Sequence, residues 1–174
     1  MSSTASIETE RLLLRPVEPG DLDELVRLHE DPAVAHYIGT PSRDWLAERI
    51  GWSRQEWTER GHGLLAILDQ ASGAFLGRTG LKYWPQFDET ELGWVLQPEA
   101  RGRGIATEAA GAALKWASER FDLPYVTAMI RPDNAPSIAV AERLGMEPLR
   151  DDELLGVGVT VYSITSSSAS SSRN

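Results

Sequence analysis

The spacing of hydrophobic residues along the chain changes repeatedly between a strand-like period of two and a helix-like period of three to four. Short apolar runs bounded by Pro, Gly or Asp predict strands, whereas longer stretches with apolar residues three and four apart predict helices. The expected strands are residues 11–15, 64–69, 75–83, 91–96, 125–130, 148–155 and 159–164. The expected helices are residues 22–30, 44–60, 105–121 and 135–144. The order β, α, α, β, β, β, α, β, α, β, β indicates an α/β or α+β sheet covered by helices.

The ends of the first two helices are predicted from capping residues. Asp21 is expected to cap the first helix, with Glu24 three residues on completing a capping box. The pair Asp31-Pro32 is expected to end this helix and to begin an irregular stretch that continues to residue 39. Ser42 is expected to cap the second helix.

The last two helices carry clear signals of their own. Asn134 is an N-cap residue, Pro136 fits the first helical turn, and Gly145 fits the stop after the helix. Small residues on one stripe of the longer helix would let it pack closely on a sheet; they are Ala106, Ala110, Ala113 and Ala117.

Length and composition favour one globular domain. The chain has 174 residues, of which 41% are hydrophobic and 25% charged, which is close to the average for proteins with a packed core. The domain is expected to span residues 7–165. Residues 1–6 and the Ser-rich tail 166–174 are small and polar, so we expect them to be disordered.

Charge and residue usage exclude several kinds of chemistry. The net charge of −9 disfavours binding to nucleic acid or to anionic membranes, and it weakly favours a cationic substrate. With no cysteine, disulfides, thiolate metal sites and a Cys nucleophile are excluded, and the three histidines form no metal-ligand pattern, so no metal is expected. No apolar run approaches the roughly 18 residues of a membrane span, and no signal-peptide pattern is present, which predicts a cytoplasmic protein.

The segment from residue 91 to residue 107 is the most informative part of the chain. A predicted strand leads into a Gly-rich loop with Arg101 and Arg103, and the loop opens a helix. Backbone N–H groups and the helix dipole then point at one spot, which suits a phosphate or pyrophosphate. The P-loop string is absent, and Thr107 stands where a Rossmann fingerprint would have Gly or Ala.

The spacing Arg101-x-x-Gly104-x-Ala106 resembles the R/Q-x-x-G-x-G/A signature of the GNAT superfamily of acetyl-CoA-dependent N-acetyltransferases. Three more segments are similar to the branch typified by the ribosomal-protein acetyltransferases RimJ and RimL. They are residues 9–16, residues 31–34, and Asn134-x-x-Ser137 with Leu144-Gly145. The resemblance covers about residues 7–165. It implies a mixed, mostly antiparallel sheet of six to seven strands with helices on both faces.

The resemblance also implies where acyl-CoA binds. Strands 91–96 and 125–130 would run parallel and splay apart, with acyl-CoA between them. The pantetheine amides would pair with the strand backbone at Trp94, Val95 and Leu96. The pyrophosphate would lie on the amides of Gly102, Arg103, Gly104, Ile105, Ala106 and Thr107. Asn134 would lie near the pantetheine arm, in addition to a role as a plain helix cap.

The reaction expected of such a site is attack of a neutral amine on a thioester, which needs a base, an oxyanion donor and an acid. Glu91 is the first candidate for the base, with a solvated strand-end carboxylate as the alternative interpretation, and Asp88 and Glu89 are weaker candidates. A backbone N–H near Val95 or Leu96 would serve the oxyanion. Many relatives place a Tyr acid at position 141, where this chain has Ala, so Ser137 is the expected substitute.

These observations predict an acetyl-CoA-dependent N-acetyltransferase that works through a ternary complex without a metal. The branch resemblance implies a protein or peptide N-terminal α-amine as acceptor. A small amine, amino acid or antibiotic is the alternative acceptor, and a non-catalytic acyl-CoA-binding module is the alternative class. The family builds its acceptor pocket near the aromatic residues Trp45, Trp52, Trp57, Tyr83 and Trp84. The oligomeric state is left open, a homodimer included.

Overall fold

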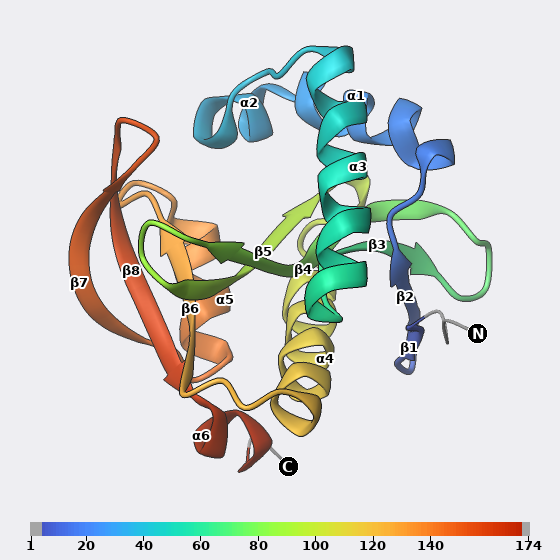
Figure 1. Cartoon of the computed structure of the whole chain (residues 1–174). Helices are drawn as coiled ribbons and strands as arrows, with labels where there is room; N and C mark the ends of the chain where they lie inside the picture. The colour runs from blue at the N-terminus through green and yellow to red at the C-terminus, as the bar shows by residue number, and fades with distance from the viewer. Residues whose placement is uncertain (1–4, 172–174) are drawn as a thin grey trace.

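One mixed β-sheet forms the frame of the molecule (Figure 1). The computed structural model describes residues 5–171. Within them the sheet has eight strands in the order β1-β2-β3-β4-β5-β6-β8-β7, and all neighbours are antiparallel except β5 and β6. The strands are β1 (Ile7–Glu8), β2 (Leu12–Pro16), β3 (Leu64–Asp69), β4 (Phe75–Trp84), β5 (Glu89–Leu96), β6 (Tyr125–Ile130), β7 (Glu147–Leu154) and β8 (Val157–Thr165).

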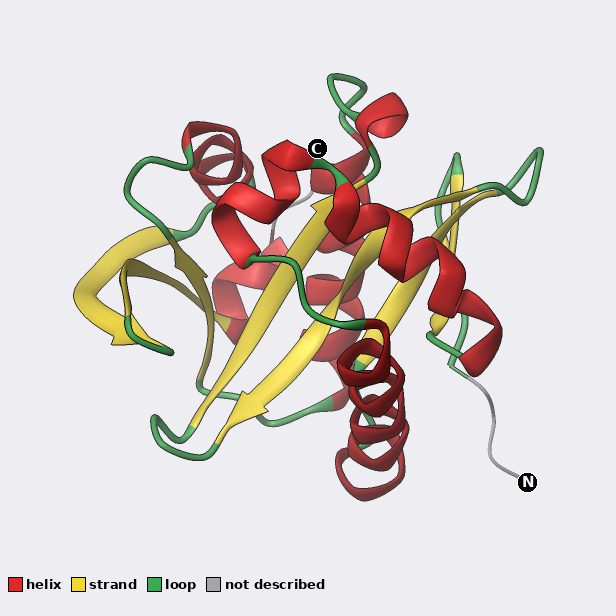
Figure 2. Ribbon diagram, turned by 90° about the horizontal axis from the view of Figure 1, so that it is seen from above, coloured by secondary structure: helices red, strands yellow, loops and turns green. Residues whose placement is uncertain are grey.

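Helices cover both faces of this sheet (Figure 2). They are α1 (Leu22–Glu30), α2 (Pro32–Ile38), α3 (Arg43–Arg60), α4 (Ile105–Arg120), α5 (Ala135–Arg143) and α6 (Ser166–Ser171). Short 3-10 turns precede α1 and α4, at Pro19–Asp21 and Pro98–Ala100. No helix among residues 5–171 is long and apolar enough to cross a membrane.

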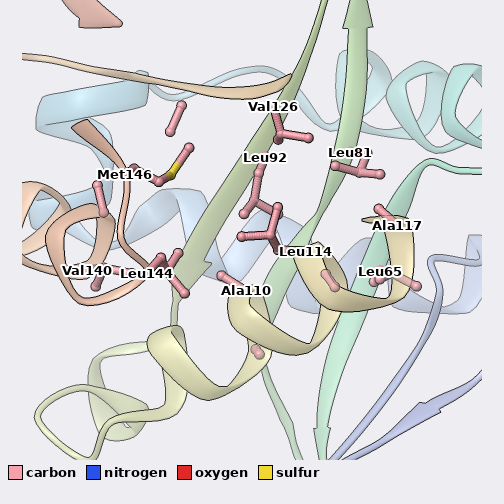
Figure 3. Close-up of a cluster of buried hydrophobic side chains, with 14 of the residues drawn as sticks. Leu65, Leu81, Leu92, Ala110, Leu114, Ala117, Val126, Val140, Leu144 and Met146 are labelled. Atoms are coloured by element: carbon pink, nitrogen blue, oxygen red, sulfur yellow. The ribbon is translucent and has the colours of Figure 1, made fainter. Parts of the chain in front are cut away.

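The alternation of side chains along the strands builds a separate core on each face. On β3, Leu65 and Ile67 pack in the core under α4, whereas Leu64 and Ala66 pack under α1, α2 and α3. The expected stripe of alanines lets α4 lie close to the sheet. Figure 3 shows Ala110 of this stripe on the side of Leu92, and Ala117 beside Leu81 and Leu65 of the neighbouring strands. The predicted fold class is confirmed, and the strand beyond the expected seven is the short β1.

Helix α2 corrects the prediction of an irregular stretch after residue 31. The pair Asp31-Pro32 does end α1, but it also starts α2: Asp31 is the N-cap residue and Pro32 is the first helical residue. Proline is favoured at this first position because its missing N–H has no partner there in any helix. Gly39, with a φ of 76°, ends α2.

The capping box expected at Asp21 and Glu24 is also corrected. The Asp21 side chain makes no capping hydrogen bond to α1. Its carboxylate instead accepts two hydrogen bonds from Arg15 (2.8 Å each) and one from the N–H of Glu18 (2.8 Å). These hydrogen bonds hold the pKa of Asp21 below its ordinary value although burial opposes them. The caps expected at Ser42 and Asn134 are present.

Part of the Ser-rich tail is helical in the structure. Residues 166–171 form α6, which contacts α4. Ala169 is only 6% exposed and joins the core under α4. The disorder expected of the tail stays a prediction. Residues 1–4 and 172–174, which belong to the two ends expected to be disordered, lie outside the described part of the chain.

The central core residue Leu92 offers a test of this packing. It is 1% exposed and lies at the middle of β5. Leu92→Ala is expected to lower the free energy of unfolding by about 2–5 kcal/mol, because the deleted side chain leaves a cavity. Urea denaturation measures the change, with the half-exposed Leu149→Ala as control. A loss as small as that of the control would contradict the assigned core.

Candidate functional site

The parallel strands β5 and β6 diverge soon after they meet. They are paired at one position, Glu91 with Thr127. Beyond it, the Met129 N–H of β6 donates to the Glu91 side chain (3.2 Å) instead of to the β5 backbone. The edge of β5 from Leu92 to Leu96 is therefore unpaired on the β6 side. The splay expected between these two strands is confirmed.

A cavity of about 580 Å³ lies at this divergence. Its walls come from β5 and β6, the whole C-terminal half of α2, the first turn of α5 and the β7–β8 hairpin. Glu91, Trp94 and Val95 line it from β5, and Asn134 and Ser137 line it from the start of α5. Five of the expected site residues, distant in sequence, thus meet in one cavity.

Glu91 is held in a fixed orientation at the cavity wall. One carboxylate oxygen accepts from Nε1 of Trp84 (3.0 Å), and the other accepts from the Met129 N–H (3.2 Å). Burial raises the pKa of Glu91 above its ordinary value of 4.5, although both hydrogen bonds and the nearby cations Arg78 and Lys82 oppose the shift. A carboxylate with a raised pKa is better suited to accept a proton than an ordinary surface carboxylate.

The first turn of α5 brings two polar side chains to the cavity. The Asn134 side-chain oxygen accepts a hydrogen bond from the Ser137 N–H (3.3 Å), which is the capping contact expected from the sequence. This contact fixes the backbone at Ser137. The hydroxyl of Ser137 makes no hydrogen bond to another described residue.

The Gly-rich loop before α4 has the shape needed for an anion. Gly102 and Gly104 have φ values of 70° and 75°, a conformation that L side chains rarely adopt. The first hydrogen bond of α4 runs from the Glu108 N–H to the Gly104 carbonyl (3.1 Å). The amides of Ile105, Ala106 and Thr107 therefore point out of the end of the helix, where they would meet a phosphate.

The two arginines of this loop have different environments. Arg101 donates to the carboxylate of Asp31 and to the Leu96 carbonyl (3.1 Å), so its guanidinium joins the loop to the start of α2 and the end of β5. This pairing lowers the pKa of Asp31. Arg103 is exposed and makes no hydrogen bond or ion pair with the described residues. The charge of Arg103 acts at a distance on Asp69 and is otherwise open to a ligand, whereas the charge of Arg101 is paired.

Several other candidates lie away from this cavity. Asp88 and Glu89 line a second hollow, where Glu89 is paired with Arg150 (2.7 and 3.0 Å) and accepts from Tyr125 (3.1 Å). None of the expected aromatic residues lines the cavity itself: Trp84 contacts it only by donating to Glu91, and Tyr83 lines the second hollow. Trp45 and Trp52 are 43% and 45% exposed and pack edge to face with each other, and Trp57 packs against the core.

Sequence reasoning missed three parts of the cavity lining. They are Arg78 of β4, residues 35–39 at the end of α2 and just after it, and the β7–β8 hairpin. Arg78 lies among small and apolar residues at the start of β4, which was a usable signal, although Lys82 places a second charge on the same strand. Among the described residues no group of three His, Asp or Glu side chains could hold a metal ion.

Comparisons with known proteins agree with this geometry. Residues 11–147 match the acetyltransferase (GNAT) domain family. The chain is 31% identical to the uncharacterised protein YkkB of Bacillus subtilis over 84% of this chain and 87% of YkkB. The structure of an acetyltransferase from Agrobacterium tumefaciens has a TM-score of 0.82 with 32% identity, and the match covers 94% of this chain and 96% of that one.

A further solved structure is that of RimL, a ribosomal L7/L12 alpha-N-protein acetyltransferase, in complex with coenzyme A. It has a TM-score of 0.78 with 19% identity, over 92% of this chain and 98% of RimL, so the likeness concerns the fold. The protein belongs to the GNAT family of acetyltransferases. It is an acetyl-CoA-dependent N-acyltransferase whose fold binds acetyl-CoA.

The raised pKa of Glu91 predicts a specific pH dependence of stability. A carboxyl group with a higher pKa in the folded protein costs stability when it ionises, so this cost is absent at low pH and appears as the pH rises above 4.5. The free energy of unfolding of Glu91→Gln, relative to wild type, is therefore expected to increase from pH 4 to neutrality. Urea titrations at each pH measure it, with the exposed Glu142→Gln as background. If the free energy of unfolding of Glu91→Gln relative to wild type stays constant or falls over this pH range, the prediction is wrong.

Proposed function

We propose that the protein transfers the acetyl group of acetyl-CoA directly to a primary α-amine, with Glu91 as general base and Ser137 as general acid. The observation that carries this proposal is the cavity at the β5–β6 divergence, which brings both side chains to one space beside an open strand edge. The Glu91 carboxylate accepts hydrogen bonds but forms no ion pair, and the Ser137 hydroxyl makes no hydrogen bond to another described residue.

The chain's own groups fit an acyl-CoA molecule. The unpaired edge of β5 at Trp94, Val95 and Leu96 supports binding of the pantetheine amides as an added strand. The outward amides of the α4 N-terminus suit the pyrophosphate, and Arg103 adds positive charge to the same place. Arg101 is a positioning residue in this proposal, because it holds the loop against Asp31 and the end of β5.

In the reaction, Glu91 takes a proton from the acceptor amine, directly or through a water molecule, as the amine nitrogen bonds to the acetyl carbon. A backbone N–H near Val95 or Leu96 stabilises the charge that develops on the acetyl oxygen. As the carbon–sulfur bond breaks, the Ser137 hydroxyl hydrogen-bonds to the leaving thiolate and passes its proton to the sulfur, while a water molecule returns a proton to the serine oxygen. The cap at Asn134 holds Ser137 in place through its backbone and lies where it can also meet the pantetheine arm.

A protein or peptide N-terminus is the first acceptor in this proposal, and it is supported by the likeness to RimL. A free amino acid or another small amine is the alternative, since the cavity admits any compact α-amine. A non-catalytic acyl-CoA-binding module is the competing class. The domain boundaries, the cytoplasmic location and the homodimer stay predictions.

Variants of the two reacting side chains test the mechanism. Glu91→Gln and Ser137→Ala are each expected to lower kcat about 10²–10⁴-fold with little effect on CoA affinity, because general acid–base catalysis contributes this much. Thiol release with acetyl-CoA and a panel of amines and peptides measures kcat, and mass spectrometry identifies the product. Glu142→Gln is the control. Tight CoA binding without thiol release in the wild type would favour the binding module.

A charge reversal tests the anion-binding loop. Arg103→Glu is expected to weaken CoA binding about tenfold or more, because it replaces a free cation beside the pyrophosphate by an anion. Arg54→Glu makes the same charge change at an exposed position of α3 and is the matched control. Calorimetric titration with CoA measures both, and the effect should shrink at high salt. Equal affinities for the two variants would contradict the loop assignment.

A further inference from the structure

Arg78 lies on the face of the sheet opposite the Gly-rich loop. Its neighbours across the strands are Ala66 and Val95, which both pack on the α1–α3 side. Trp94 and Leu96, the alternate residues of β5, pack with α4 on the other side. A cofactor bound along the N-terminus of α4 would occupy the α4 side of the sheet. The α1–α3 side of the cavity would then be open to the acceptor.

The guanidinium of Arg78 has no fixed partner in the protein. It lines the cavity and makes no hydrogen bond or ion pair with the residues that the structure describes. Burial lowers the pKa of Arg78 to about 10, so the group is still charged at neutral pH. A charged side chain that is partly buried in a cavity without a direct partner is costly, and such groups are typical of binding sites.

The surrounding charges do not neutralise Arg78. The charged groups that act on one another here are the cations Arg49, Arg78 and Lys82 and the carboxylates Glu56 and Glu91. Arg49 is paired with Glu56 at 3.6 Å, and Lys82 lies over the ring of Trp84 at 4.7 Å. One positive charge is left over, and Arg78 is the cation that reaches the cavity.

The remaining titratable neighbour adds no compensating charge. Burial, with Arg78 nearby, lowers the pKa of His29 to about 4, so this ring is neutral at physiological pH. Glu91 is not a direct partner either, because it makes no hydrogen bond or ion pair with Arg78 and acts on it only at a distance. Within one cavity the chain thus presents a proton acceptor at Glu91 and an unpaired cation at Arg78.

We propose that Arg78 binds a carboxylate of the acceptor, so that the preferred substrate is an amine with a carboxylate a few bonds away. A free amino acid has this chemistry, as does a peptide whose first residue is Asp or Glu. The amine lies toward Glu91 and the carboxylate toward Arg78. This inference rests on the proposed acetyl transfer, and it replaces the cationic acceptor suggested by the net charge of −9.

Matched acceptor pairs provide the test. Each pair differs in a single carboxylate: glutamine against glutamine α-amide, and C-terminally amidated peptides that begin with Asp or with Asn. The wild type is expected to acetylate the carboxylate member with a kcat/KM about tenfold or more above that of its partner, because hydrogen bonds to charged groups are worth this much. A preference within the first pair indicates a free amino acid as the acceptor, and a preference within the second pair indicates a peptide whose first residue is acidic.

Arg78→Gln is expected to abolish this preference, whereas Arg54→Gln, at an exposed position of α3, retains it. An effect of Arg78 on the base Glu91 would change kcat/KM equally for both members of a pair. If Arg78 acted only through Glu91, the ratio of the two kcat/KM values would therefore stay the same in Arg78→Gln. A wild type that treats both members alike, or a preference that survives in Arg78→Gln, overturns the inference while acetyl transfer stands.

A binding measurement separates the two failures. If no amine is acetylated, the proposed function fails, and calorimetry in the presence of CoA then compares N-acetylglutamate with its diamide. Binding of the acid alone, lost in Arg78→Gln, supports the carboxylate site without turnover. Equal binding of both compounds, or no binding, overturns it.

Discussion

The separation of β5 from β6 is the constraint on which the rest of the site depends. Two parallel strands that part inside a sheet leave backbone N–H groups without partners, and each such buried group costs free energy unless something replaces the lost contact. Glu91 supplies the replacement by accepting from the Met129 N–H. The same carboxylate lines the cavity that the separation creates. The group that makes the opening tolerable is therefore also the group best placed to take a proton.

Local charge in this protein departs from its total charge. The chain carries −9, yet the acceptor side of the cavity has an excess of cations, and the loop before α4 presents Arg103. Most acidic side chains lie on exposed surfaces or in ion pairs such as Asp21 with Arg15 and Glu108 with Arg11. Global charge thus says more about the solvent-facing surface than about which substrate the cavity prefers.

Local patterns predicted the elements well where the periodicity was strong: β3 and β6 have the expected bounds, and α4 keeps its stripe of buried alanines. Errors arose where one signal had two meanings. Asp31-Pro32 ends one helix and starts another. Glu91, Asn134 and Ser137 were found because their motifs are local. Arg78 was missed because its meaning depends on charges contributed by α3, β4 and β5 together.

The contact of Arg101 with Asp31 and the Leu96 carbonyl has a mechanical consequence. Asp31 immediately precedes α2, which forms one wall of the cavity, and Leu96 ends the open edge of β5. The Gly-rich loop begins at Arg101 itself. Because one planar guanidinium contacts all three segments, a movement of the α2 wall is coupled to the position of the Gly-rich loop and of the end of β5.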